Sequence, residues 1–173
     1  MSLEIRNTKE LIDPANLKLK ILIYGLAGTG KTAWLSTVPG IGIAACETGL
    51  GSGLLTVADK DISFCVPSSY AEFEAIASGK VFGDKEAIGL DSLTEMVNTF
   101  VKERSLALPR ARGESDKRKL GVPELDDYGT MGELTRRLLR KLIDSTPTQH
   151  VIVTATERID KPDPENGDRK SVV

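Results

Sequence analysis

The chain alternates between short, continuous apolar runs and segments in which apolar residues recur every three or four positions. Continuous runs of this length are typical of strands buried on both faces of a sheet, and the three-to-four spacing is typical of helices. The predicted strands cover residues 17–24, 41–46, 62–66, 86–91 and 149–155. The predicted helices cover residues 30–38, 69–78, 92–108 and 130–144. This alternation predicts an α/β fold, a three-layer sandwich with a mostly parallel sheet between helices.

Short sequence motifs mark where three of these helices begin or end. Ser69 and Glu72, and again Ser92 and Glu95, have the spacing of a capping box at a helix start. The pair Pro39-Gly40 follows the first helical segment, and proline cannot continue the helical hydrogen-bond ladder. We therefore expect that helix to end near Val38.

Composition limits the kind of protein. The chain has 173 residues, 40% of them hydrophobic and 28% charged, with a net charge of −2, as expected for one globular domain. No run approaches the roughly 20 apolar residues of a membrane span, and the first residues lack the apolar core of a secretion signal, so we expect a cytoplasmic protein without a membrane partner. Cys46 and Cys65 lie in or beside apolar runs, which favours free thiols over a disulfide or a metal pair.

A glycine-rich segment directly after the first predicted strand is the most specific motif. Residues 25–32 read G-L-A-G-T-G-K-T, the spacing of a P-loop. Glycine allows the backbone to curl so that successive N–H groups point at phosphate oxygens. Lys31 is then expected to reach the β- and γ-phosphates, and the Thr32 hydroxyl to bind Mg²⁺. The predicted nucleotide-binding positions are Gly25, Ala27, Gly28, Thr29, Gly30, Lys31, Thr32 and Ala33.

Two acidic residues end neighbouring apolar runs. In an open parallel sheet, ligands bind beyond the carboxyl ends of the strands, where Asp91 and Glu47 are expected to lie. Asp91 is the predicted second ligand for Mg²⁺, with a plain helix cap as the alternative. Glu47 is the predicted group that activates water, with a solvated loop glutamate as the alternative. Lys31 and Glu47 are thus the predicted catalytic residues.

Further polar residues have weaker signals. Thr154 or Thr156, at the end of the last strand, is a candidate donor to the γ-phosphate, although threonine is common in strands. Arg158 is a candidate arginine finger or a surface residue. The spacing of Trp34 suits core packing. The guanine-reading motif N-K-x-D does not follow the last strand, which favours adenine.

Five short segments, taken in order, resemble a family of phage-encoded RecA-like P-loop ATPases, some of which are linked to single-strand annealing and recombination. The segments are residues 20–32, 46–49, 90–94, 128–129 and 151–155. The resemblance implies that Lys31 and Thr32 bind phosphate and Mg²⁺, and that Asp91 is the Walker B acid. It also implies that Glu47 matches the water-activating glutamate. Gly89 departs from the branched apolar residue usual in that strand.

Composition, turn signals and the resemblance together give the expected domain plan. Residues 1–16 form an N-terminal arm, and residues 17–160 form the RecA-like nucleotide-binding domain. Residues 161–173 form a flexible loop or the start of a hairpin, with Asn166-Gly167 at its tip. Because RecA-like cores usually continue with more strands, the chain is expected to be a truncated or reduced member.

We therefore expect an ATP- and Mg²⁺-binding ATPase that acts as a homo-oligomer on single-stranded DNA. Basic residues in 102–119 and on the next helix are candidate DNA contacts, with a solvated charged surface as the alternative. Those on the helix are Arg136, Arg137, Arg140 and Lys141. Two other functions fit the sequence. One is a small-molecule kinase in which residues 110–119 form a lid, and the other is a non-catalytic module that binds a partner when nucleotide is present.

Overall fold

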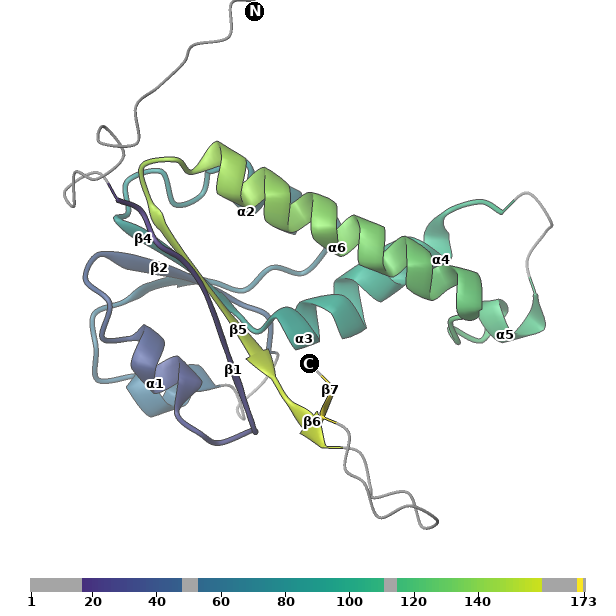
Figure 1. Cartoon of the computed structure of the whole chain (residues 1–173), viewed down its shortest axis with the longest axis horizontal. Coiled ribbons are helices and arrows are strands. Elements are labelled where there is room, and N and C mark those ends of the chain that lie inside the picture. Colours follow the sequence, from purple (N-terminus) through teal and green to yellow (C-terminus); the bar gives the residue numbers. More distant parts are fainter. Residues whose placement is uncertain (1–16, 48–52, 111–114, 160–170, 173) are drawn as a thin grey trace, which may run out of the picture.

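The structure is a computed structural model, and it describes residues 17–47, 53–110, 115–159 and 171–172. Five strands form one sheet in the order β1-β5-β4-β2-β3, and every neighbouring pair is parallel (Figure 1). These strands are β1 (Lys20–Gly25), β2 (Ile41–Ala45), β3 (Ser63–Cys65), β4 (Ala87–Asp91) and β5 (His150–Thr156). The α/β class and the parallel sheet predicted from the sequence are thus confirmed.

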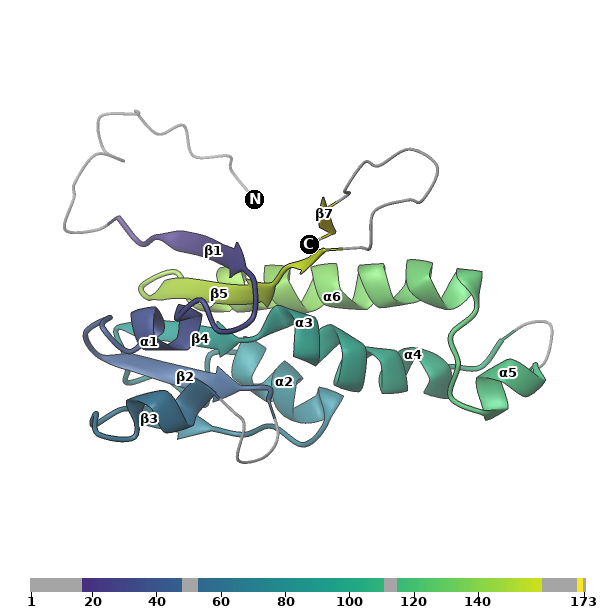
Figure 2. The same cartoon turned by 90° about the horizontal axis from the view of Figure 1, so that it is seen from below.

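Helices cover both faces of the sheet, as Figures 1 and 2 show. One face carries α1 (Lys31–Leu35) and the short 3-10 helix η2 (Gly53–Val57). The other carries α2 (Tyr70–Ala77), α3 (Leu93–Met96), the π-helical turn η3 (Val97–Val101), α4 (Lys102–Ala107) and α6 (Leu125–Ser145). The short helix α5 (Asp116–Lys119) lies at the far end of α4 and α6.

The central strands are buried along their whole length. All five residues of β2 and of β4 are buried, as their continuous apolar sequence predicted. Gly89 has a packing explanation, because a Cβ there would lie 3.1 Å from Ile41 and 3.5 Å from Leu35 of α1. The missing side chain therefore lets α1 approach the sheet closely.

Several boundaries differ from those predicted. Helix α1 ends at Leu35 rather than Val38. Helix α6 begins at Leu125 rather than residue 130, because Glu124 and Asp127 form a reciprocal capping box that extends the helix toward its N-terminus. Trp34 was predicted to pack in the core but is 46% exposed, since Leu35 takes the buried position on this short helix.

A buried ion-pair network fixes α5 against the start of α6. Arg118 donates to the Asp127 carboxylate and to the Ser105 carbonyl, and all three residues are buried. Arg110 pairs with Glu124 at 2.6 Å and with Asp127 at 3.0 Å. These two arginines of the predicted basic loop therefore stabilise the fold.

The last described strands form a small hairpin. β6 (Arg158–Ile159) continues directly from β5 and pairs antiparallel with β7 (Ser171–Val172). The predicted tip at Asn166-Gly167 lies outside the described residues, as do the N-terminal arm 1–16 and most of 161–173. Within the described part of the chain, no helix has the length and apolar character needed to cross a membrane.

Candidate nucleotide-binding site

The glycine-rich segment forms an exposed loop between β1 and α1. Gly28 and Gly30 have φ angles of 78° and 84°, in the region that glycine adopts without strain, as the motif predicted. Gly25 has an ordinary φ, and its place is explained by a close approach, since a Cβ there would lie 3.3 Å from the Thr29 hydroxyl. Ala27 and Ala33 are exposed on the same loop and helix.

The backbone N–H groups of the loop are the second feature of this site. Among the described residues, none accepts a hydrogen bond from the backbone N–H groups of Gly28, Thr29 and Gly30. The Lys31 ammonium lies back over the loop and donates to the carbonyls of Gly25 and Leu26, at 3.0 and 2.9 Å. Within the described residues, the loop thus has N–H donors without an acceptor and a lysine ammonium bound to its own carbonyls. Both features are typical of a turn that binds anions.

Asp91 lies opposite the loop, with each carboxylate oxygen bound by a threonine. Thr32 donates to Oδ2 at 2.6 Å, and Thr154 donates to Oδ1. Asp91 ends β4, Thr154 lies on β5, and β5 lies between β4 and β1, so strand order brings the three together. Asp91 and Thr32, which the sequence predicted to lie at the same end of the sheet, are thus in contact. The peptide bond from Asp91 to Ser92 is cis.

Asp91 is also more than a helix cap. Ser92 caps α3, because its hydroxyl accepts from the Glu95 backbone N–H at 3.4 Å. The Asp91 side chain is free of that task and points to Thr32 and Thr154. The alternative in which Asp91 merely caps the helix is therefore not what the structure shows.

Glu47 is linked to the P-loop helix by Gly53. The Glu47 carboxylate accepts from the backbone N–H of Gly53 at 3.4 Å. Gly53 itself sits against the P-loop helix, because a Cβ on it would lie only 2.2 Å from the Thr32 hydroxyl. Sequence reasoning missed Gly53, whose only signal was its place in a glycine-rich stretch after Glu47.

The pKa of the Cys46 thiol is affected by both acidic residues. Burial raises the pKa of the Cys46 thiol well above its usual range, and the negative charges of Asp91 and Glu47 contribute to the same shift. Glu47 follows Cys46 in the chain, and the Cys46 backbone N–H donates to the Asp91 carbonyl at 2.6 Å, so both acidic residues adjoin this buried residue. Cys46 and Cys65 are free cysteines, as predicted, although Cys65 is only partly buried.

The two candidate threonines of β5 have different surroundings. Thr154 is fully buried and contacts Asp91, so any effect on a ligand must act through that carboxylate. Thr156 is partly exposed, pairs in register with Gly25, and donates its backbone N–H to the Thr94 hydroxyl at 2.9 Å. Of the two, Thr156 lies where the first turn of the loop begins. The side chain of Arg158 lies outside the described residues.

Comparison with known proteins agrees with this geometry. None of the curated proteins compared with the chain matches it. A family model described as an AAA domain matches residues 17–173, which include the loop, Glu47, Asp91 and the whole sheet. Because this match covers most of its length, the chain belongs to the AAA domain family of nucleotide-binding P-loop ATPases.

Proposed function

We propose that the protein is a RecA-like ATPase that binds ATP with Mg²⁺, hydrolyses it, and acts on DNA in phage recombination or replication. The observation that carries the proposal is the hydrogen bond from Thr32 to Asp91 beside a loop with unpaired N–H groups. In this proposal the residues that would bind the metal ion therefore lie directly beside the loop that would bind the phosphates. The match to the AAA domain family supports the nucleotide-binding part.

The donor set fits Mg²⁺. This cation prefers hard oxygen ligands and is usually held by one or two protein groups together with phosphates and waters. The Thr32 hydroxyl donates a hydrogen bond to Asp91, which leaves the lone pairs of the hydroxyl oxygen available to a cation, and the carboxylate supplies the negative charge. Thr32 and Asp91 would hold the ion, which, when bound, neutralises charge on the phosphates.

Lys31 and Glu47 divide the remaining chemistry. In our proposal Lys31 exchanges its two carbonyl acceptors for phosphate oxygens, which are stronger acceptors because they are charged. Glu47, held near Thr32 by Gly53, accepts a proton from the attacking water. The loop N–H groups stabilise the negative charge on the phosphates.

A basic cleft on the other face of the sheet supports the DNA part. It has a volume of about 660 Å³ and lies between α2, α4 and α6. Its cations are Arg104, Arg137, Arg140 and Lys141, and its acids are Glu74 and Asp144. None of the four cations forms an ion pair with another described residue. Unpaired cations around a cleft suit a phosphate backbone.

Phosphate release from ATP tests the catalytic part, measured with and without single-stranded DNA. We expect Lys31→Ala and Glu47→Gln each to abolish turnover, and only Lys31→Ala to weaken nucleotide binding strongly. Lys80→Ala and Glu103→Gln are the matched controls, because both residues are exposed and neither lies on the P-loop or its helix. Unchanged turnover in Lys31→Ala and Glu47→Gln would contradict the proposal.

The same assay separates the two alternatives. A small-molecule kinase needs an acceptor before the γ-phosphoryl group leaves, whereas an ATPase releases phosphate to water alone. The kinase reading also required a mobile lid, but Arg110 and Arg118 are held in ion pairs at the start of α6. A non-catalytic module would bind ATP tightly and show no turnover with any nucleic acid.

A further inference from the structure

Trp34 is an exposed aromatic residue on the P-loop helix α1. Its side chain is 46% exposed, whereas its neighbour Leu35 is fully buried. The backbone N–H of Trp34 donates to the Gly30 carbonyl at 2.8 Å, so Trp34 lies one helical turn after the last glycine of the loop. An indole ring carries a large apolar surface, and a ligand that covered it would gain free energy from that contact.

Helix geometry places Trp34 beside the lysine of the P-loop. Positions three apart on a helix, such as Lys31 and Trp34, are neighbours on its surface. Helical side chains also lean toward the helix N-terminus, which in α1 is the end that carries the loop. Thr32, about 200° away from Trp34 around the helix axis, faces Asp91 instead. The indole therefore lies next to the loop but outside the proposed metal site.

A nucleotide held by this loop needs a further contact for its base. The backbone donors of a P-loop bind phosphates and suit any polyphosphate chain. A base is a flat ring, and proteins commonly bind such rings by stacking them on aromatic side chains. Aromatic residues near the loop are thus the candidate base contacts.

Most aromatic residues of the chain lie far from the loop. The chain has one Trp, three Tyr and four Phe residues, and all of them are within the described ranges. Tyr70 and Tyr128 lie on α2 and α6, which cover the opposite face of the sheet from α1. Phe64 lies on β3, four strands from β1, which is about 19 Å at the usual strand spacing. The other three phenylalanines are buried in the core, namely Phe73, Phe82 and Phe100.

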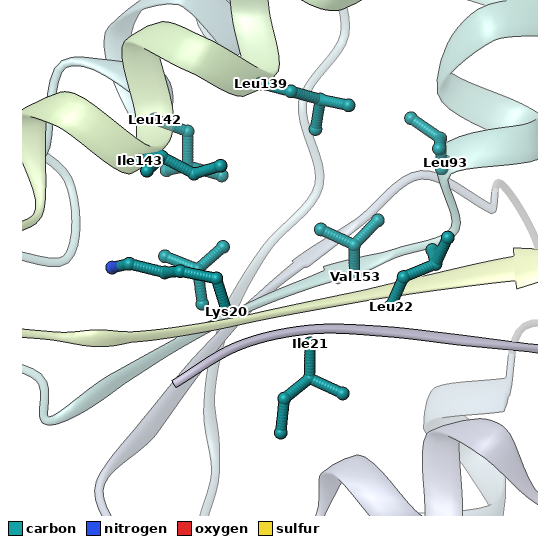
Figure 3. A pocket seen from close by; sticks show the side chains of 9 residues that line it. Lys20, Ile21, Leu22, Leu93, Leu139, Leu142, Ile143 and Val153 are labelled. Carbon is teal, nitrogen blue, oxygen red and sulfur yellow. The ribbon is translucent and has the colours of Figure 1, made fainter. Parts of the chain in front are cut away.

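Tyr24 is next to the loop in sequence but faces the other side of the sheet. Side chains alternate along a strand, so Tyr24 shares a face with Lys20 and Leu22. Figure 3 shows Lys20 and Leu22 on the α6 side of β1 and Ile21 on the opposite side, where α1 lies. Among the described residues, Trp34 is therefore the exposed aromatic residue on the face and helix of the loop.

We propose that Trp34 stacks on the base of the bound nucleotide and gives the site a preference for purines. The proposal rests on the nucleotide binding proposed above, and it adds the contact that distinguishes a nucleotide from bare polyphosphate. A purine has a larger flat face than a pyrimidine, so it stacks more strongly on an indole. Because Trp34 binds the base and not the reacting phosphate, it affects affinity rather than the chemical step.

Tryptophan emission tests the stacking, because Trp34 is the sole tryptophan of the chain. An indole stacked on a base loses fluorescence. We expect ATP with Mg²⁺ to lower the emission of the full chain until the site is saturated. Tripolyphosphate with Mg²⁺ has no base, so it should displace ATP without lowering the emission. Equilibrium dialysis with radiolabelled ATP measures binding independently, and ATP that binds there without any change in emission would overturn the proposal.

Substitutions at Trp34 separate stacking from plain apolar contact. Trp34→Ala should weaken ATP binding about tenfold, leave tripolyphosphate binding unchanged, and raise KM for ATP at constant kcat. Trp34→Phe keeps an aromatic face and should retain most of the affinity, whereas Trp34→Leu should not. Phe64→Ala is the matched control, because Phe64 is likewise exposed and lies on the far strand β3.

The two probes separate a failure of this proposal from a failure of nucleotide binding. If neither ATP nor tripolyphosphate binds the wild type, the proposed function and the stacking are both overturned. If both bind, but Trp34→Ala keeps the wild-type affinity for ATP or loses affinity for both probes equally, only the stacking is overturned. A loss of ATP affinity in Tyr24→Ala instead of Trp34→Ala would also overturn it, because the base would then lie on the other face.

Discussion

Thr32 and Asp91 are 59 residues apart in the sequence, and their side chains are joined by a hydrogen bond of 2.6 Å. One belongs to the helix after the P-loop and the other ends β4. Asp91 is 7% exposed, and its second oxygen is bound by Thr154. The carboxylate is therefore held in one orientation by the protein itself, which would lower the cost of assembling the proposed metal site.

Thr154→Val tests whether Thr154 positions Asp91. Valine keeps the shape but removes the donor, so Oδ1 loses its partner and the carboxylate gains freedom. We expect turnover to fall about tenfold and the Mg²⁺ concentration for half-maximal activity to rise, with a stability loss of about 1–2 kcal/mol. Steady-state ATPase assays at varied Mg²⁺ check this.

Thr154→Ser is the control, because it retains the hydroxyl and should restore the Mg²⁺ dependence of the wild type. A role that is only structural would lower stability in Thr154→Val without moving that dependence. Wild-type Mg²⁺ dependence in Thr154→Val would therefore contradict the positioning role.

Gly53→Ala tests the close contact between η2 and the P-loop helix. A Cβ at Gly53 would lie 2.2 Å from the Thr32 hydroxyl, so either Thr32 rotates away from Asp91 or η2 moves. We expect at least about a tenfold loss of turnover with the fold retained, as measured by ATPase assay and circular dichroism.

Gly132→Ala in α6 is the matched glycine control. A Cβ there meets no atom within 4 Å, and alanine is the better helix former. It should stabilise the protein by about 0.5–1 kcal/mol in denaturant unfolding and leave turnover unchanged. Full activity in Gly53→Ala would show that the contact has no part in the site.

The sequence predicted those parts of the site that local pattern determines. The P-loop could be predicted because its strand, glycine spacing and helix are contiguous in the sequence. Asp91 could be proposed because it ends a continuous apolar run. Gly53 and the bond from Thr154 to Asp91 were not readable, because both depend on which strands become neighbours. The periodicity of apolar residues predicts which face of a strand or helix a side chain lies on. It does not predict which residue of a neighbouring strand that side chain contacts.

The misplaced boundaries have a similar cause. Helix α6 was predicted to start at residue 130 but starts at Leu125, because the capping box of Glu124 and Asp127 adds a turn at its N-terminus. The basic loop was interpreted as a solvent-facing segment or a lid. Its Arg118 is instead buried, because a carboxylate from a later helix meets it.

Arg137→Glu tests the basic cleft as a DNA contact. Reversing one charge in the cleft should weaken binding of single-stranded DNA about tenfold and reduce its salt dependence, as measured by fluorescence anisotropy. Arg136→Glu is the control, since Arg136 neighbours Arg137 on α6 but is already paired with Glu133 and does not line the cleft. Equal losses in the two variants would indicate general electrostatics rather than this cleft.

Acid should loosen the network at α5. Burial disfavours the charged form of Asp127, but the backbone N–H of Glu124 and the charges of Arg118 and Arg110 outweigh it and lower the carboxyl pKa. A lowered pKa in the folded state adds stability at neutral pH, which is lost as the pH falls through that pKa. We expect the free energy of unfolding to decrease on acidification below about pH 4.

Asp127→Asn checks the source of that acid sensitivity. The variant should be less stable at neutral pH by about 3 kcal/mol, because Arg118 is left buried without its counter-charge. Its stability should then change less than that of the wild type over the acidic range. Parallel acid profiles for the two proteins in urea unfolding would assign the sensitivity to other carboxylates.

The position of β1 at the margin of the sheet has a consequence for dynamics. The loop that surrounds the proposed phosphates follows a strand that, among the described residues, is bonded on one side, whereas Asp91 ends a strand bonded on both sides. Amide hydrogen exchange should therefore be fast at the outward N–H groups of Lys20, Leu22 and Tyr24 and slow throughout β4. A nucleotide that slows exchange in β1 would order the loop and its strand together, so occupancy of the proposed site could be followed from the exchange of this strand alone.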